Sequence, residues 1–267
     1  MEHYTALSPY LKRRFGCKVY KLSLSAGCTC PNRDGTLGAR GCIFCSGSGE
    51  FAASGSASIP EQLEQAKYIL GKKAQGAKFI AYFQDFTNTY GTVSRLEPLF
   101  LAAIEAGDVV ALSIATRPDC LPEDILRMLS RLRARKPVFV ELGLQTIHDN
   151  TAQYIRRGYP LSVFDDAVQK LHALDIEVIA HQILGLPGET AVMMSETSRY
   201  LGSVHVDGVK LHLLHVLRGT DLAREYAEGR IQMLELDTYI DILEQCLAVL
   251  PPDVVIHRLT GDGAKRD

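Results

Sequence analysis

The sequence predicts an α/β protein whose parallel strands form part of a barrel. Short apolar segments alternate with amphipathic helical segments six or seven times along the chain, which is typical of a parallel sheet covered by helices. No expected strand is followed by Gly-x-Gly-x-x-Gly, the pattern that favours a doubly wound sheet. Polar residues also interrupt several strands. Because polar groups are costly in a filled barrel core, they indicate a lumen that holds a polar ligand.

Strands are expected where short apolar runs lie between turn signals. They are Lys18–Ser25, Phe79–Gln84, Val109–Ala115, Val138–Leu144, Glu177–Leu184, Val209–Leu214 and Val254–Ile256. Helices are expected where apolar residues recur every three to four positions, as Leu63, Ala66 and Leu70 do after the helix-starting Pro60. They are Pro60–Lys73, Val93–Glu105, Pro122–Arg135, Leu161–Leu174, Thr190–Leu201 and Leu234–Leu250.

A glycine-rich stretch after the first strand holds four of the seven cysteines, Cys28, Cys30, Cys42 and Cys45. The stretch has few apolar anchors, so a metal centre is its expected source of order. Four thiolates suit tetrahedral zinc, although one residue between Cys28 and Cys30 is tighter than the usual zinc knuckle. Three thiolates, on Cys30, Cys42 and Cys45, suit a four-iron cluster with one open iron. Free structural thiols are the third alternative.

Candidate ligand-binding residues occupy strand faces and strand ends. By the two-residue period of a strand, Glu141 and Gln145 share one face, and Lys210 and His212 share another. Loops that follow the carboxyl ends of parallel strands build the active site of a barrel. The cysteine stretch follows the first strand, so it is expected at that same end, where a reactive centre is more useful than a structural zinc.

Composition indicates one domain of 267 residues, with 46% hydrophobic residues and a net charge of −2. The expected organisation is a basic N-terminal extension over residues 1–17 and a barrel core over residues 18–263. Residues 1–50 hold seven Lys/Arg against three Asp/Glu. With an odd number of clustered cysteines, no signal peptide and no long apolar run, we expect reduced thiols in the cytoplasm and no membrane partner.

Motifs over nearly the whole chain resemble the radical S-adenosylmethionine (SAM) superfamily, in its YhcC/YtqA-type branch, which is similar to the catalytic subunit of Elongator. Eleven residues separate Cys30 from Cys42, unlike the superfamily's usual Cys-x-x-x-Cys-x-x-Cys, but this branch has such a gap; Cys28 lies outside the pattern. The branch tends to continue past its Leu-Thr-Gly-Asp motif, so a further segment beyond residue 267 is expected. The matching segments are Thr29–Gly35, Gly41–Cys45, Ala81–Gln84, Thr87–Tyr90, Ile114–Asp119, Glu141–Thr146, Gly185–Glu189, Val209–Leu214 and Leu259–Asp262.

The resemblance implies a partial (β/α)6 TIM-like barrel and two cofactors, a [4Fe-4S] cluster and SAM. It implies that Cys30, Cys42 and Cys45 ligate three irons, and that the fourth iron chelates the amino and carboxylate groups of SAM. An electron from a donor such as flavodoxin or ferredoxin then cleaves SAM to a 5′-deoxyadenosyl radical, which abstracts hydrogen from the substrate.

Roles for the polar residues follow from the resemblance and from their strand positions. The methionyl end of SAM is expected at Gln84 and Asn88, and its ribose or carboxylate at Ser113, Thr116 and Arg117. The remaining candidates bind SAM near its sulfonium, sugar or adenine, or act on the substrate. The SAM candidates are Glu141, Gln145, His181 and Gly185, and the catalytic candidates are Glu141, Lys210 and His212.

The wobble uridine of tRNA is the leading substrate, with a small metabolite or a protein side chain as the alternative. A zinc-stabilised barrel without redox chemistry is the other class of function. Basic residues interleave with aromatic ones near the N-terminus, which suits either RNA or an ordinary solvated helix end. The expected phosphate contacts are Lys12, Arg13, Arg14, Lys18 and Lys21, and the expected stacking residues are Tyr10 and Phe15.

Overall fold

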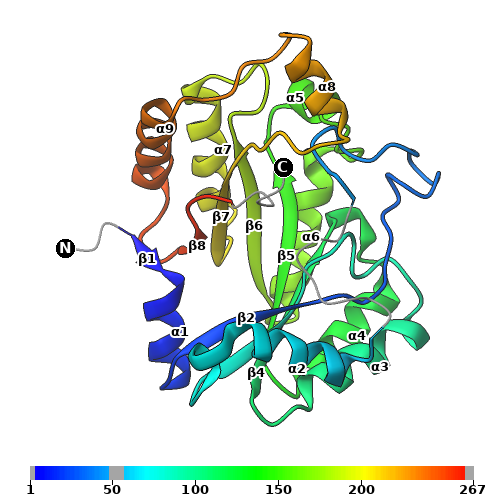
Figure 1. Cartoon of the computed structure of the whole chain (residues 1–267). Helices are drawn as coiled ribbons and strands as arrows, with labels where there is room; N and C mark the ends of the chain where they lie inside the picture. The colour runs from blue at the N-terminus through cyan, green and yellow to red at the C-terminus, as the bar shows by residue number, and fades with distance from the viewer. Residues whose placement is uncertain (1–3, 48–56, 262–267) are drawn as a thin grey trace.

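Eight parallel strands form one curved sheet in the computed structural model, which describes residues 4–47 and 57–261 (Figure 1). The strand order is β1-β8-β7-β6-β5-β4-β3-β2, and each neighbouring pair is parallel. The sheet is open between β1 and β2, so the barrel is partial, as predicted. The strands are β1 Thr5–Ala6, β2 Val19–Leu24, β3 Lys78–Phe83, β4 Val109–Thr116, β5 Val138–Gln145, β6 Glu177–Leu184, β7 Gly208–Leu213 and β8 Val255–Arg258.

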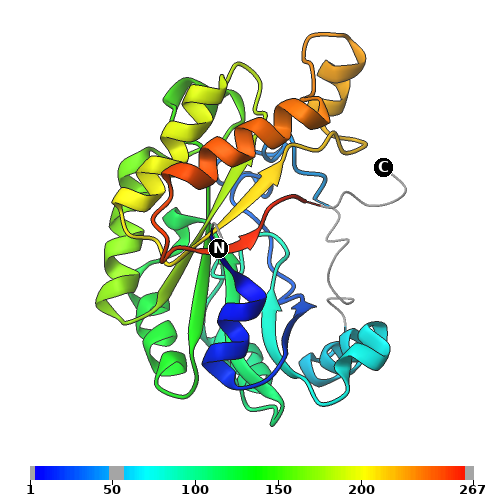
Figure 2. The same cartoon turned by 90° about the vertical axis from the view of Figure 1, so that its left-hand side faces the viewer.

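Helices cover the outer face of the sheet (Figure 2). Those that connect successive strands are α2 Ile59–Leu70, α3 Val93–Ile104, α4 Glu123–Arg133, α6 Leu161–Ala173, α7 Ala191–Ser203 and α9 Leu236–Val249. Their apolar faces pack on the outward residues of the strands in one large core, in which the rings of Phe83 and Phe100 meet edge to face at 4.8 Å. The α2 helix begins at a capping box formed by Ser58 and Glu61.

Every predicted strand and helix is present, with boundaries that differ by a few residues. Six short elements and one strand pairing were not predicted. Most of them lie in connections, where the apolar pattern is too short to show a period. They are β1, α1 Leu7–Phe15, α5 Asp149–Tyr154, α8 Asp221–Ala227, and the 3₁₀ turns η1 Gly71–Ala74 and η2 Pro118–Cys120, together with the separate pairing of β8 with β1.

The α1 helix closes the barrel at the amino ends of its strands. Leu11 is 2% exposed and packs in a cluster with Ile80, Phe139 and Ile179, each near the start of its strand. The hydroxyl of Tyr10 donates to Glu177 at the start of β6 over 3.1 Å. The segment predicted as a basic extension is therefore part of the barrel, at the end opposite the cysteine stretch.

The RNA contacts predicted for this segment are wrong for four residues. Arg14 pairs with Glu177 at 2.5 Å and Tyr10 is bonded to the same carboxylate, so neither offers a free group. Phe15 packs against the cluster that Leu11 forms with Ile80, Phe139 and Ile179. The ammonium of Lys21 enters the lumen, where it is bonded to Glu141.

Among the helices that the structure describes, none has the length and apolar character needed to cross a membrane.

Candidate active site

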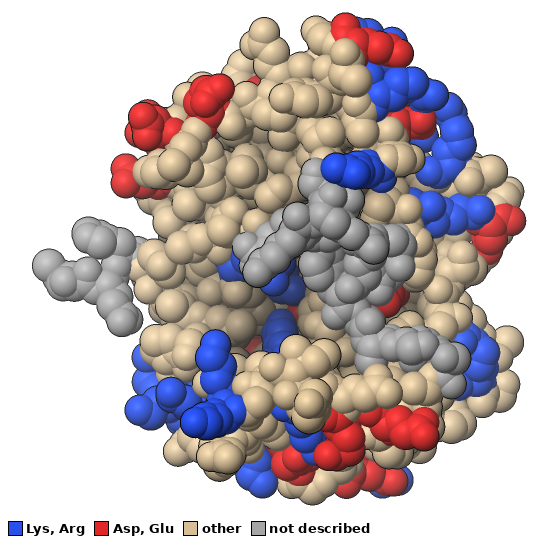
Figure 3. All heavy atoms as spheres, viewed as in Figure 1, with Lys and Arg blue, Asp and Glu red and all other residues tan. Residues whose placement is uncertain are grey.

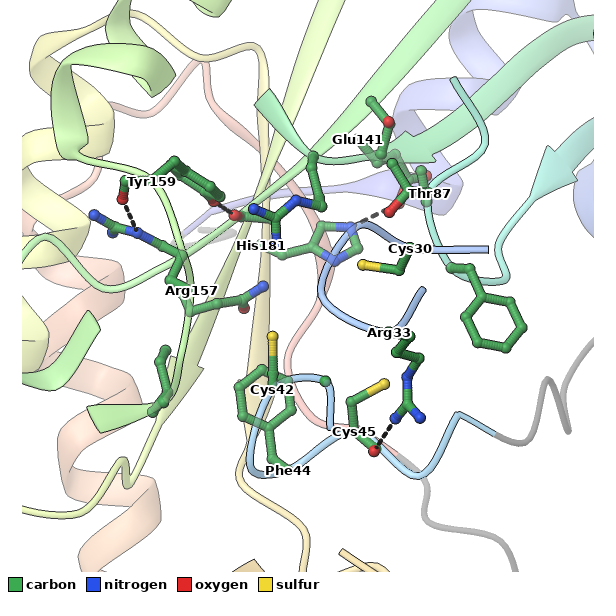
Figure 4. Close-up of a pocket in the computed structure, with 18 of the residues that line it drawn as sticks. Cys30, Arg33, Cys42, Phe44, Cys45, Thr87, Glu141, Arg157, Tyr159 and His181 are labelled. Atoms are coloured by element: carbon green, nitrogen blue, oxygen red, sulfur yellow. Dashed lines mark hydrogen bonds and ion pairs between the residues drawn. The ribbon is translucent and has the colours of Figure 1, made fainter. Parts of the chain in front are cut away.

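A cavity of about 220 Å³ lies between the cysteine stretch and the carboxyl ends of β3, β4, β5 and β6 (Figure 4). Its walls come from the cysteine stretch, from the loops that follow β3 and β4, and from the loop that follows β5. Cys30, Cys42 and Cys45 lie around one gap in this cavity. The cavity, called the cluster cavity below, is therefore at the end of the barrel where the sequence placed the active site.

The cysteine stretch is held by polar contacts and not by an apolar core of its own. The amide of Asn32 donates to the carbonyl of Arg156 over 2.7 Å, and it lies 3.4 Å from the sulfur of Cys42. The guanidinium of Arg33 donates to the carbonyl of Cys45. The same guanidinium lies over Gly41 and Gly47, where the Cβ of any other residue would overlap it. Both glycines also have positive φ, so the stretch needs glycine there for two reasons.

The fourth cysteine of the stretch does not line the cluster cavity. Cys28 is buried in the main core, and its sulfur accepts from Arg95 over 2.9 Å. Burial raises the pKa of this thiol. A zinc site made of all four cysteines is therefore contradicted, and the three-cysteine interpretation remains.

The three cavity cysteines fit a cluster better than a single ion. In residues 4–47 and 57–261, no three His, Cys, Asp or Glu side chains are grouped closely enough to hold one metal ion. A four-iron cluster binds each cysteine through a different iron, so it requires sulfurs that surround a space. Cys30, Cys42 and Cys45 are arranged in this way around the gap of the cluster cavity.

The floor of the cluster cavity is a charged network centred on Glu141 of β5. One carboxylate oxygen accepts from Lys21 and from Ser113, each over 2.6 Å. The other accepts from His181 over 2.8 Å and from the ammonium of Lys210. These four donors occupy the lone pairs of the carboxylate, whose side chain has no exposed area.

The network sets the charge of each member. Burial by itself raises the pKa of Glu141, but Lys21, Lys210 and His181 hold it well below its usual range. Burial lowers the pKa of Lys210 to about 7, with Glu141 opposing the shift. Burial and the nearby Lys210 lower the pKa of His181 to about 4, so this imidazole is neutral at pH 7. The hydroxyl of Tyr82 accepts a further hydrogen bond from Lys210 over 2.9 Å.

A buried guanidinium lies beside the cluster cavity, on the loop after β5. Arg157 is 3% exposed and donates to the carbonyls of Thr146 and Tyr159 over 2.5 and 3.1 Å. Its Nη2 is buried and has no hydrogen-bond partner among the residues that the structure describes. Buried donors are nearly always paired, so this nitrogen is unusual, but the guanidinium extends away from the three cysteines (Figure 4). Arg117, by contrast, is held by both oxygens of Asp119 at 2.8 and 2.7 Å.

A family model described as Radical SAM superfamily matches residues 33–201, more than half of the chain. The chain belongs to the radical SAM superfamily. A second model, the Radical_SAM C-terminal domain, matches residues 206–267. Enzymes of this superfamily use a [4Fe-4S] cluster and SAM. The residues that line the cavity are therefore compared with what these two cofactors need.

Three known proteins show the range of similarity. YtqA of Bacillus subtilis (strain 168) is 42% identical over 264 residues, which cover 98% of this chain and 82% of that protein. A tRNA uridine(34) acetyltransferase of Dehalococcoides mccartyi is 32% identical over 161 residues, 57% of this chain and 33% of its own length. The solved structure of Elp3 from Methanocaldococcus infernus has a TM-score of 0.69 at 19% identity and covers 92% of this chain and 57% of that chain, which shows the fold.

Six of the predicted SAM residues line the cluster cavity of this radical SAM protein: Gln84, Thr116, Arg117, Glu141, Gln145 and His181. These side chains differ in whether their hydrogen-bonding groups are already paired within the protein. Gln145 has no hydrogen-bond partner among the described residues, whereas Arg117 and Glu141 are already paired. A role for Glu141 in holding ribose therefore requires one of its four donors to move.

Five predicted residues lie outside the cavity: Asn88, Ser113, Gly185, Lys210 and His212. Asn88 is fully buried and donates to the carbonyls of Phe83 and Ala115, both over 3.0 Å, so it joins two strand ends. Ser113 and Lys210 lie beneath the floor, bonded to Glu141. The structure therefore corrects the predicted contact of Ser113 and Lys210 with SAM or substrate. The Oδ1 of Asn88 is buried without a partner among the described residues, so its role stays a prediction.

Gly185 is also corrected, because the space beside it is filled by Leu234, 2.9 Å from the position of a Cβ. Gly185 also does not line the cluster cavity. His212, the remaining catalytic candidate, lies outside the cluster cavity and lines a neighbouring one.

Sequence reasoning missed Arg157 and Tyr159, which line the cavity from the β5–α6 connection. A signal was present, because Arg156-Arg157-Gly158-Tyr159 lies in a loop between a strand and the next helix, on the face where active-site loops gather. Arg33 and Phe44 were also missed, although they lie between the cysteines.

We expect Glu141→Gln to lower the free energy of unfolding by about 3–5 kcal/mol at pH 7, because it leaves the buried Lys210 and the partly buried Lys21 without their shared counter-charge. The folded-state pKa of Glu141 is lowered, so its contribution is complete above the ordinary glutamate pKa of about 4.3 and is lost as the pH falls below it. Urea unfolding should therefore show a smaller difference in the free energy of unfolding between variant and wild type at acid pH than at pH 7.

Glu177→Gln is the matched control, since Glu177 pairs with Arg14 and its side chain is 25% exposed. This change should cost no more than about 1 kcal/mol. Equal losses in the two variants would contradict the central role of Glu141.

Proposed function

We propose that this chain holds a [4Fe-4S] cluster on Cys30, Cys42 and Cys45, binds SAM in the cluster cavity and acts on a uridine of tRNA. The observation that carries the proposal is the meeting, around one gap of the cluster cavity, of three thiols from a loop without an apolar core. When bound, the cluster and SAM supply a radical that removes a hydrogen atom from the substrate. An external one-electron donor, such as flavodoxin or ferredoxin, completes the proposal.

The residues around the cysteines position the proposed ligands. Asn32 joins the stretch to the loop after β5, and its amide is directed at the Cys42 sulfur, where it stabilises a thiolate. The backbone N–H groups of Ile43 and Leu222 donate to the carbonyls of Ile155 and Ile43, respectively, at 3.3 and 3.0 Å. These contacts fix the stretch against α5 and α8.

We expect Cys30→Ala, Cys42→Ala and Cys45→Ala each to abolish cluster binding, because the proposed site needs all three thiolates to hold the cluster. Cys28→Ala should retain the cluster, because its sulfur lies in the core against Arg95. Iron and sulfide content after anaerobic reconstitution measures both. Loss of iron from Cys28→Ala, in a variant whose circular dichroism is native, would contradict the three-cysteine site.

Arg157 is proposed to bind the carboxylate of SAM. Its Nη2 is the buried donor without a partner in the described chain, and a carboxylate is its strongest acceptor. The ring of Tyr159 lies between two cations, 4.8 Å from Arg157 and 5.1 Å from Arg117, and so holds both guanidinium groups in place. Gln84, Thr116 and the other lining residues remain candidates for the rest of SAM.

We expect Arg157→Gln to weaken SAM binding by about 10- to 150-fold, the effect of losing one hydrogen bond to a charged group. Methylthioadenosine lacks the amino-carboxylate, so its affinity should change less than twofold. Calorimetric titration of both ligands into reconstituted protein makes the comparison. Equal losses for the two ligands would mean that the substitution disturbs the loop and that Arg157 does not bind the carboxylate.

The tRNA part of the proposal is supported by a similarity in sequence and by a charged surface. A relative that matches more than half of this chain is named a tRNA uridine(34) acetyltransferase. Beside the cysteine stretch, three arginines surround the single carboxylate of Asp221: Arg156 and Arg224 bond to it, and Arg40 lies 3.6 Å away. These three, called the arginine rim below, carry two positive charges in excess of Asp221.

The arginine rim replaces the N-terminal segment as the proposed phosphate contact. Basic side chains gather over α8 and the cysteine stretch at the upper right of the molecule (Figure 3). The side chains of Arg40 and Arg224 are 70% and 60% exposed. A substrate held there lies next to the cluster cavity, whereas Lys12, Arg13 and Lys18 lie around α1 at the opposite end of the barrel.

We expect tRNA affinity to fall steeply with salt, and the double change Arg40→Ala and Arg224→Ala to flatten the slope of log affinity against log salt by about 1.4–1.8 units. Filter binding over a salt series measures the slope. Lys12→Ala with Arg13→Ala is the matched control, because it removes the same charge at the far end of the barrel. If only the control flattens the slope, the N-terminal segment and not the arginine rim contacts the phosphates. Absence of tRNA binding would favour a small metabolite or a protein side chain as substrate.

A further inference from the structure

A second cavity of about 240 Å³ adjoins the cluster cavity. It lies between Phe44 of the cysteine stretch and the carboxyl ends of β6 and β7, and Phe44, Gln145 and His181 line both cavities. It is called the histidine pocket below, because His212 and His215 join His181 in its wall. Anything bound there lies beside the proposed site of SAM.

Two side chains of the histidine pocket have hydrogen-bonding groups that the described chain does not use. The Nε2 of His212 is buried and has no partner in residues 4–47 and 57–261. The amide of Gln145 is likewise unpaired in those residues, and it folds over Gly143, where a Cβ would lie 2.8 Å from it. Gln145 also has a φ of 70°, an uncommon value for a residue other than glycine. Such a conformation is often kept where it aims a side chain at a ligand.

The charge of the histidine pocket selects a neutral ligand. Burial, His181 and Lys210 keep the pKa of His212 well below its usual value, so its ring offers one donor and one acceptor. The rest of the wall is largely apolar and includes Ile183, Leu214 and Leu217. A charged group would lose its hydration there without gaining a counter-ion.

The aromatic wall favours a flat ring. Phe44 supplies the aromatic face on which proteins stack unpaired bases. Enzymes that act on a base commonly extrude it from its stack into such a pocket.

We propose that the histidine pocket receives the target nucleobase, an uncharged ring with donors and acceptors on its edge. Phe44 stacks on the ring, and His212 and Gln145 bind its edge. The base then lies beside the cluster cavity, while the arginine rim contacts the phosphates. This inference rests on the proposed action on tRNA and adds which residues recognise the base.

The test uses the full chain with its cluster and without SAM, so that no turnover occurs. Two anticodon stem-loop RNAs are compared, one with uridine at the first anticodon position and one with an abasic residue there. Wild type should bind the uridine RNA at least tenfold more tightly, the effect of stacking and hydrogen bonds together. His212→Leu should reduce that preference at least fivefold and leave the affinity for the abasic RNA within twofold.

His205→Asn is the matched control, because His205 is exposed in the turn before β7 and has a positive φ that asparagine tolerates. It should keep the wild-type preference. A second measurement follows the imidazole NMR signal of His212. In wild type this signal should shift when free uridine is added and should stay unchanged when inorganic phosphate is added.

The outcomes separate this inference from the tRNA proposal. Equal affinity of wild type for the two RNAs overturns the base pocket and leaves RNA binding intact. An unchanged preference in His212→Leu also overturns it. If neither RNA binds, the tRNA proposal is wrong, and the NMR titration decides the pocket by itself: no shift of His212 with uridine overturns it.

Discussion

The lumen depends on one buried carboxylate. Glu141 of β5 joins Lys21 of β2, His181 of β6 and Lys210 of β7, so a single side chain connects four strands of an open sheet. Lys21 comes from the edge strand, and its ammonium also lies 3.4 Å from His257 of β8 near the other edge. The network therefore bridges the opening through the lumen, while α1 covers it at the amino ends.

This arrangement explains why polar residues interrupt the strands. A barrel of this size is normally filled by apolar side chains, and isolated charges there would be very costly. Here the two lysines share one carboxylate, and a neutral histidine and a serine complete its hydrogen bonds. The result is a polar floor under the cluster cavity, with the cavity itself free for ligands.

The cysteine stretch depends on the barrel for its shape. It contributes only Ala26, Cys28 and Ile43 to the buried apolar residues, and it is fixed largely by Asn32, Arg33 and the arginines of the loop after β5. The loop after β5 also places Arg157 beside the cluster cavity and Arg156 at the arginine rim. The loop after β5 thus links the proposed cofactor site to the proposed RNA surface.

The amino-acid sequence by itself determined the strand and helix order and the end of the barrel that carries the cysteine stretch, while it left a four-cysteine and a three-cysteine site both open. These depend on local period and spacing, which each segment expresses alone. Only the tertiary structure decided that Cys28 turns to the core, that Lys210 lies beneath the floor while His212 lines a pocket, and that Leu234 fills the space beside Gly185. It also revealed Arg157. Whether a polar atom is free depends on partners that lie far away in the chain, and Glu141 accepts from residues up to 120 positions distant.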